Sequence, residues 1–143
     1  YLYELTGDTA LLPLAKKYTM AIEEAKNLTW HHDVGFIVEC SFGNGLRLTG
    51  DSVYKEVVIQ AARSLSTRFR EVPGIIQSWN VERGWQSERG WQCPVIVDNM
   101  MNLAMRVYSG ELTDSDEARS HYFTLSLASV APYLRMKDRR DAI

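Results

Sequence analysis

Cysteines and long apolar runs are both scarce in this sequence. Its 143 residues include two cysteines, Cys40 and Cys93, which are too few and too far apart to form a zinc cluster, so we expect two reduced, buried thiols. Neither a signal peptide nor a membrane-spanning run is visible, which favours the cytoplasm over the periplasm. The chain starts at Tyr1, inside what reads as a helix end, so we expect a fragment whose own N-terminus is missing.

An excess of charge of one sign is missing too. No block of lysine or arginine exceeds a few residues and the formal net charge is -2, which gives no indication of a nucleic acid or a membrane surface as a partner. With 45% hydrophobic and 24% charged residues, the composition is that of a soluble globular protein, and the length is that of one domain.

Several catalytic motifs are absent as well. There is no Gly-rich phosphate loop after a strand, no Gly-x-Ser-x-Gly sequence and no Cys/His pair at the spacing of a nucleophilic dyad. His31 and His32 could ligate a metal, but no third and fourth ligand follows at a suitable spacing, so we expect no metal site. His121 has no acid partner nearby in sequence and is expected to be structural.

What the sequence does contain is a series of amphipathic helices. Apolar residues recur at helical spacing from Leu11 to Ala25 and from Tyr54 to Phe69, and another helix is predicted from about Gly35 to Leu48. Later helices are expected from near Pro94 to about Tyr108 and from about Asp116 to Ala131. No convincing strand appears, so the predicted fold class is all-α.

A short turn sequence separates these helices. Leu5-Thr6-Gly7-Asp8 recurs as Leu48-Thr49-Gly50-Asp51 and, more weakly, as Leu112-Thr113-Asp114. We expect the glycine to be the left-handed C-cap of one helix, and the aspartate or the next Thr or Ser to cap the following helix. Helical hairpins that repeat in this way predict a solenoid or a closed α/α toroid.

Two carboxylates stand out because each lies at a predicted helix start beside apolar or aromatic residues. Asp98 interrupts an apolar run after Pro94, and Asp33 follows two histidines. An acid among apolar residues costs stability unless it is paired or protonated, and in a toroid two such acids could share one sugar site. Asp98 has the more apolar neighbours, so we expect it to be the protonated member. The alternative is that both are only N-caps.

Tryptophans strengthen the case for a sugar site. Four of them fall in predicted loops near the acids: Trp30, Trp79, Trp85 and Trp91. Indole rings stack on the apolar faces of sugars and carry one N–H donor, although packing of loops against helix ends is the alternative. Residues 71–93 form a long loop in which Glu-Arg-Gly-Trp-Gln occurs twice, and loops of this length are usually functional.

An ordered set of motifs resembles the unsaturated glucuronyl hydrolases of glycoside hydrolase family 88. The set covers roughly residues 30 to 110 and comprises His32-Asp33-Val34-Gly35-Phe36, Ser41-Phe42-Gly43-Asn44-Gly45, Leu48-Thr49-Gly50, Ser78-Trp79, Trp91-Gln92 and the run from Pro94 to Leu103. Within that run, Asp98-Asn99-Met100-Met101-Asn102-Leu103 is specific. The resemblance implies that residues 1–143 are one partial (α/α)6-barrel catalytic domain, about the first half of the barrel, with residues 71–93 as a Trp-rich active-site loop.

The same resemblance implies an activity. Such enzymes remove the C4=C5 unsaturated uronic acid that lyases leave at the non-reducing end of oligosaccharides, including those from glycosaminoglycans, by hydrating the vinyl ether. Asp98 would protonate C4 and then act as base on the water that adds at C5, while Asp33 would bind ring hydroxyls and tune Asp98, or act as nucleophile. Substrate contacts are expected from His32, Trp79, Trp91 and Asn99. No metal or organic cofactor is implied, and the oligomeric state stays open.

Two departures from the family pattern limit these expectations. The duplicated segment between Trp79 and Trp91 leaves open which tryptophan stacks on substrate, with Trp85 as the inserted copy. The later substrate-binding segments have no counterpart, so activity is expected to need the rest of the barrel. The alternatives are an unsaturated rhamnogalacturonyl hydrolase and a non-catalytic helical-repeat module that binds carbohydrate.

Overall fold

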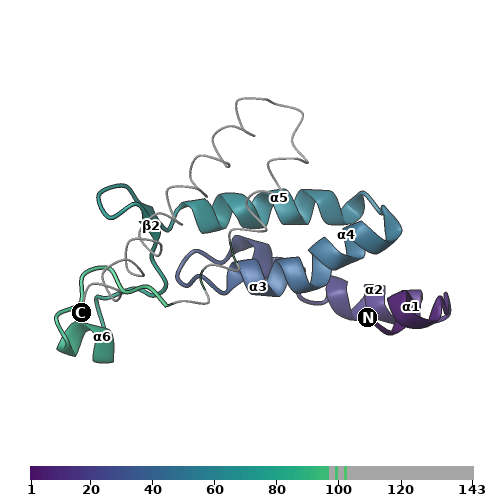
Figure 1. The fold of residues 1–143 in the computed structure, drawn as a ribbon, viewed down its shortest axis with the longest axis horizontal. Coiled ribbons are helices and arrows are strands. Elements are labelled where there is room, and N and C mark those ends of the chain that lie inside the picture. Colours follow the sequence, from purple (N-terminus) through teal and green to yellow (C-terminus); the bar gives the residue numbers. More distant parts are fainter. Residues whose placement is uncertain (97–98, 100–101, 103–143) are drawn as a thin grey trace, which may run out of the picture.

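The computed structural model describes residues 1–96 together with Asn99 and Asn102. Its helices are α1 (Leu2–Thr6), α2 (Leu11–Met20), the 3-10 helix η1 (Glu23–Asn27), α3 (Val34–Val38), the π-helix η2 (Glu39–Gly43), α4 (Asn44–Thr49), α5 (Val53–Ser66) and α6 (Trp85–Glu88). Two short antiparallel strands, β1 (Phe69–Arg70) and β2 (Ile75–Ile76), pair with each other. In Figure 1, α1 and α2 lie at one end of the molecule and β2 and α6 at the other.

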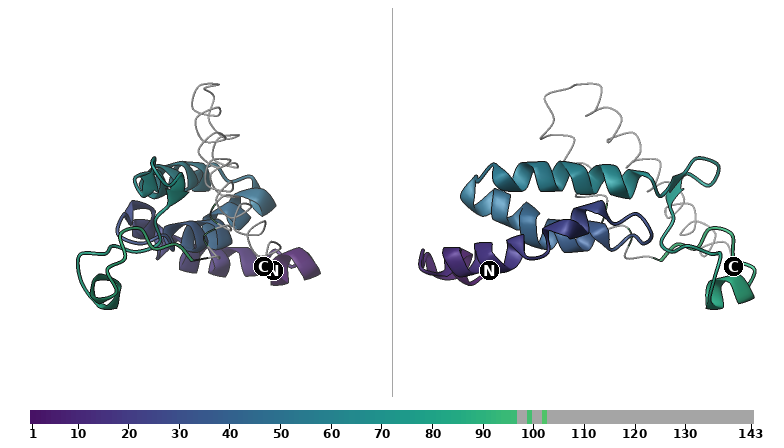
Figure 2. Two further views of the ribbon diagram at one scale, coloured as in Figure 1. Left: turned by 60° about the vertical axis from the view of Figure 1, so that its left-hand side comes forward. Right: turned by 180° about the vertical axis from the view of Figure 1, so that it is seen from behind.

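The core lies between α5 and the helix formed by α3 and η2. Every view shows α5 running beside α3 (Figure 2). The buried cluster consists of Val34, Val38, Phe42, Tyr54, Val57, Val58, Ala61, Ala62, Leu65 and Ile76. Six of these residues, from Tyr54 to Leu65, form the stripe predicted from helical spacing, because positions three and four apart share one helix face. Burial of each larger apolar side chain contributes about 1.5–3 kcal/mol, so this stripe is what holds α5 in place.

The helix predicted near Gly35–Leu48 is present, with one turn of π-helix in its middle. Glycine at position 45 allows α4 to approach α5, because a Cβ there would lie 2.8 Å from the Tyr54 ring. Gly45 therefore lets the two helices pack closely.

The two complete copies of the turn have the same structure. Gly50 has φ 67° and follows α4, its N–H donates to the Leu46 carbonyl, and Asp51 Oδ1 accepts the N–H of Val53 at 3.1 Å. The first copy repeats this pattern, with Gly7 at φ 69° and Asp8 Oδ1 accepting the N–H of Ala10 at 2.9 Å. The predicted glycine C-cap is therefore confirmed, and in both turns the aspartate bonds the start of the next helix. The third copy, residues 112–114, lies outside the described residues.

Several expectations on the secondary structure are wrong. Helix α2 ends at Met20 and the apolar stripe continues in η1, and Ala10, not Thr9, occupies the N-cap position. The strands β1 and β2 were not expected, and residues 71–93 are not purely loop, because they contain β2 and α6. Residues 94–96 are not helical, so no helix begins at Pro94.

The remaining expectations concern the thiols and the C-terminal part of the chain. Cys40 and Cys93 are unpaired as expected, but Cys40 is exposed. His121 and the helices predicted up to Tyr108 and from Asp116 lie outside the described residues. Within the described ranges, the helices are all too short or too polar to span a bilayer.

Candidate active site

Asp33 occupies the N-cap position of α3, but its carboxylate makes no capping hydrogen bond. Its oxygens instead lie 3.6 Å from His31 Nδ1 and 3.5 Å from His32 Nδ1, and the side chain is 53% exposed. No lysine or arginine of the described part of the chain pairs with it. The cap-only interpretation of Asp33 therefore lacks the bond that would support it, and the carboxylate is open to solvent.

His31 is held as a neutral ring. The backbone N–H of Asp33 donates to His31 Nδ1 at 3.1 Å, so this nitrogen carries no proton. Burial lowers the pKa of His31 below its ordinary value, and the nearby carboxylate of Asp33 opposes this effect only in part. The neutral ring does not cancel the negative charge of Asp33.

His32 is buried and its ring orientation is set by the main chain. Its backbone N–H donates to the Ser78 carbonyl at 3.1 Å, and its ring Nδ1 also lies 3.1 Å from the same oxygen. Because a carbonyl can only accept, Nδ1 carries the proton. The ring also makes edge-on contacts with Phe36 and Trp79, each at 5.9 Å between centroids. The expected substrate contact of His32 stays a prediction.

Ser78 joins three segments that are far apart in the sequence. On one side it adjoins Trp79, which forms an antiparallel β-bridge with His31. On the other side its N–H donates to the Pro94 carbonyl at 2.9 Å. Its hydroxyl oxygen accepts the N–H of Ile96 at 3.1 Å. The segment that leads into Asp98 is thereby bonded to the residue that also holds His32. Asp98 itself lies outside the described residues.

Three of the four tryptophans form a continuous row. Ring centroids are 5.9 Å apart for Trp79 and Trp85, and 5.2 Å apart for Trp85 and Trp91. The guanidinium of Arg89 lies 5.4 Å from the ring centroids of both Trp85 and Trp91. These two rings remain 47% and 40% exposed, so they offer an aromatic surface next to a cation. Trp30 is separate and packs against His31.

Arg68 fastens the segments around the site, and the sequence interpretation missed it. Its side chain is 2% exposed, Nε donates to the Gln77 carbonyl at 2.7 Å, and Nη1 donates to the Thr29 carbonyl and to Asn80 Oδ1. Burial lowers the pKa of Arg68. Its spacing could have indicated burial, because Arg68 lies three residues after Leu65 and continues the spacing of the buried residues just beyond the end of α5.

Asn99 is buried and bonded to protein groups. Its Nδ2 donates to the Ile76 carbonyl, and its Oδ1 accepts from Asn102 Nδ2 at 2.7 Å. Asn99 is 3% exposed and Asn102 is 1% exposed. A direct contact of Asn99 with substrate stays a prediction, whereas the structural bonds are present.

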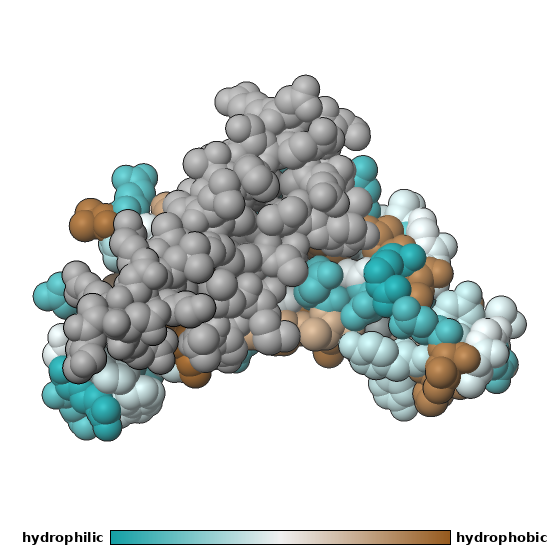
Figure 3. Space-filling model, viewed as in Figure 1, coloured by the Kyte–Doolittle hydropathy of each residue, from teal (hydrophilic) through white to brown (hydrophobic). Residues whose placement is uncertain are grey.

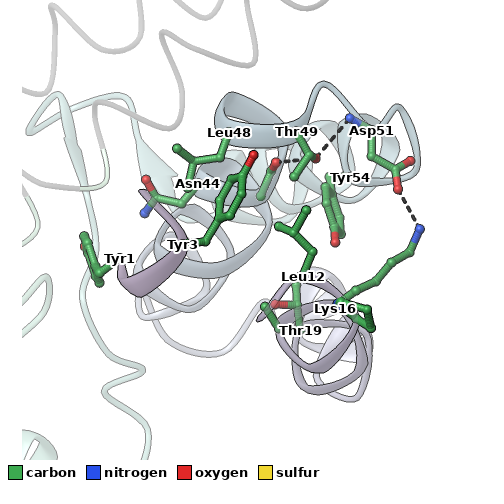
Figure 4. A pocket seen from close by; sticks show the side chains of 13 residues that line it. Tyr1, Tyr3, Leu12, Lys16, Thr19, Asn44, Leu48, Thr49, Asp51 and Tyr54 are labelled. Carbon is green, nitrogen blue, oxygen red and sulfur yellow. Dashed lines mark hydrogen bonds and ion pairs between the residues drawn. The ribbon is translucent and has the colours of Figure 1, made fainter. Parts of the chain in front are cut away.

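Hollows of the described chain also lie elsewhere. A hollow of about 580 Å³ is lined by residues of α1, α2, α4 and α5, and Figure 4 shows the side chains that line it. One carboxylate lines it, Asp51, which is bonded to Lys16 at 2.6 Å. Neither Asp33 nor the tryptophans contribute to it, so this cavity is not the candidate site. Among the residues with described positions, no cluster of three or more His, Cys, Asp or Glu could hold a metal ion.

Comparison with known proteins gives a consistent set of relatives. No family model matches the sequence. The chain is 40% identical over 105 residues to an unsaturated glucuronyl hydrolase of Formosa agariphila, covering 73% of this chain and 25% of that protein. It is 31% identical over 121 residues to an unsaturated glucuronyl hydrolase of Bacillus sp. strain GL1, covering 82% and 31%. The chain thus spans about a quarter to a third of the length of these relatives.

A solved structure has the same fold. The crystal structure of an unsaturated glucuronyl hydrolase specific for heparin superposes with a TM-score of 0.74 at 34% identity, covering 90% of this chain and 33% of that one. The prediction of an all-α, partial (α/α)6 barrel is therefore confirmed.

Proposed function

We propose that this chain is part of an unsaturated glucuronyl hydrolase, a glycosidase to whose known members it is similar in sequence and in fold. The substrate would be an oligosaccharide that carries a C4=C5 unsaturated uronic acid at its non-reducing end. The observation that carries the proposal is the carboxylate of Asp33, which is exposed, makes no capping bond and lies close to His31 and His32, and the His32 ring contacts Trp79 of the tryptophan row.

The chemistry of the substrate explains why carboxyl groups are suited to it. The C4=C5 double bond is conjugated with the ring oxygen, so it is electron-rich at C4 and a positioned acid can protonate that carbon. Positive charge then develops at C5 and the ring oxygen, and a nearby carboxylate stabilises it. Water adds at C5 to give a hemiketal, whose ring opening leaves a ketone at C5, and the hemiacetal at C1 then releases the remaining oligosaccharide.

The two acids would divide this work. Asp98 is the proposed proton donor to C4 and the base for the incoming water. Asp33 has an exposed carboxylate that makes no capping bond, so it can accept hydrogen bonds from ring hydroxyls and stabilise the developing charge. The segment of residues 71–93 would supply sugar-stacking surface through Trp79 and Trp91.

The direct test is loss of the ultraviolet absorbance of the C4=C5 bond. The substrates are unsaturated disaccharides from heparin and chondroitin, and an unsaturated rhamnogalacturonan disaccharide, with the longest polypeptide that contains this sequence as enzyme. We expect turnover of at least one glucuronyl substrate and a loss of about 100-fold or more in kcat for Asp33→Asn and Asp98→Asn. Turnover of the rhamnogalacturonan disaccharide alone would support the alternative that this is an unsaturated rhamnogalacturonyl hydrolase. Sugar binding that is unchanged in Asp98→Asn, without turnover by the parent, would support a binding module.

A further inference from the structure

Two buried amides connect the chain next to Asp98 with both β2 and α3. Asn99 donates to the Ile76 carbonyl, and Asn102 donates to Asn99 Oδ1 at 2.7 Å. Ile76 belongs to β2 and to the core cluster. The two amides therefore form a short chain of hydrogen bonds that ends on a fixed main-chain group.

Gly35 provides the contact with α3. A Cβ on Gly35 would lie 1.9 Å from Asn102 Oδ1, so any larger residue there would overlap the amide. Gly35 is two residues after Asp33, and Asn99 directly follows Asp98. The amide pair thus joins the neighbourhoods of the two proposed acids through packed atoms.

The amides also select one alignment of their segment. The residue that follows Asn99 is Met100, whose side chain has no donor for the Ile76 carbonyl. A shift that placed Met100 there would leave that carbonyl without its bond. Such a buried polar network costs free energy, here visible in Asn102 Oδ1, which has no hydrogen-bond partner among the described residues. An apolar core would pack at lower cost but would not discriminate between alignments.

We propose that Asn99 and Asn102, seated on Gly35, are positioning residues that set where Asp98 lies relative to Asp33. The inference rests on the proposed function in that it takes these two aspartates as the acids of the reaction. Neither amide needs to touch the substrate, because its effect would be transmitted through the placement of Asp98.

The test compares glycine and asparagine variants in the longest active polypeptide that contains this sequence. Gly35→Ala creates the overlap with Asn102, and Gly35→Ala combined with Asn102→Ala removes it again. Gly45→Ala is the matched control, because a Cβ there also overlaps a side chain, the Tyr54 ring, between α4 and α5. The measurements are Tm, kcat and KM for each variant.

We expect Asn102→Ala and Gly35→Ala each to lower kcat by about 100-fold with little change in KM, because a displacement of about 1 Å of a reacting group has that effect. Gly45→Ala should lower Tm without a comparable loss of kcat. The combined variant should have a higher Tm than Gly35→Ala, while its kcat should stay low. The proposal would be overturned if the combined variant had the kcat of the parent. It would also be overturned if Asn102→Ala lowered Tm but left kcat unchanged.

A second measurement keeps the proposal separate from the proposed function. Crystal structures of the parent and of Asn102→Ala give the distance between the Asp33 and Asp98 carboxyl carbons. We expect this distance to change by about 1 Å, the scale at which reacting groups lose their alignment. A parent without turnover would refute the proposed function alone, and an unchanged distance would refute the positioning role.

Discussion

His32 is joined to Ser78 twice, because its backbone N–H and its ring Nδ1 both lie 3.1 Å from the Ser78 carbonyl oxygen. Two donors on one acceptor fix the rotation of the ring as well as the path of the backbone. The same serine bonds Pro94 and Ile96, so the position of His32 beside Asp33 depends on the segment that precedes Asp98.

Replacement of His32 should therefore affect stability strongly. We expect His32→Ala to lower the free energy of unfolding by about 3 kcal/mol, because it opens a cavity beside Phe36 and Trp79 and removes a buried hydrogen bond. His32→Asn should recover part of this loss, since its amide can replace Nδ1 as donor. Urea denaturation measures both variants. Equal losses for alanine and asparagine would argue against the hydrogen bond.

Arg68 should not be replaceable by lysine. Lysine cannot bond Gln77, Thr29 and Asn80 at once, so we expect Arg68→Lys to lower the free energy of unfolding by about 2–3 kcal/mol. Arg63→Lys is the matched control on the exposed face of α5 and should change it by less than about 0.5 kcal/mol. The same urea titration compares the two variants. Similarly small changes in the free energy of unfolding would contradict the stabilising role of the Arg68 hydrogen bonds.

Glu39 should make stability depend on pH. Burial raises the pKa of this carboxyl, and its Oε2 has no hydrogen-bond partner in the described part of the chain. A raised pKa means that the folded state binds more protons than the unfolded state, so stability falls as pH rises from about 4.5 through the folded-state pKa. Glu39→Gln should remove this slope and raise the free energy of unfolding at pH 7 by about 1 kcal/mol. Urea denaturation at pH 4 and at pH 7 measures the free energy of unfolding of the parent and of Glu39→Gln. The same pH dependence in both proteins would contradict a raised pKa of Glu39.

His31 should produce the opposite slope at higher pH. Burial lowers the pKa of this ring, so the folded state binds fewer protons than the unfolded state below the ordinary value of 6.5. Stability contributed by the neutral ring is complete above pH 6.5 and is lost as pH falls through the lowered pKa. His31→Gln should flatten this part of the profile, measured by thermal unfolding between about pH 5 and pH 7.5. A profile identical to that of the parent would contradict the assignment.

The exposed end of the tryptophan row should affect binding more than chemistry. If Trp91 stacks on a sugar, Trp91→Ala should raise KM about tenfold and leave kcat nearly unchanged, because loss of about 1.4 kcal/mol of binding has that effect. Trp85→Ala tests its neighbour in the same way. Trp30→Ala, outside the row and 60% exposed, is the control. Steady-state kinetics on a disaccharide and on the tetrasaccharide dGlcA-Glc-Rha-Glc, which is bound in a similar solved structure, distinguish proximal from distal stacking.

Sequence alone determined the parts of this protein that depend on local periodicity and local bonding. The stripe from Tyr54 to Leu65 predicted α5, because side chains at helical spacing share a face wherever the helix lies. Gly7 and Gly50 marked the helix ends, because their left-handed backbone is a local property. Ordered motifs also indicated the family and the partial barrel, which the similar structures confirm.

Tertiary structure decided which polar groups are bound to protein and which are open. Asp33 could have been a simple cap, but its carboxylate is open and faces two histidines. The amide of Asn99 bonds the Ile76 carbonyl, and Arg68 holds segments that lie 39 and 9 residues away in the chain. Such bonds join distant segments, so no local pattern specifies them, and they depend on how the helices and β2 come together.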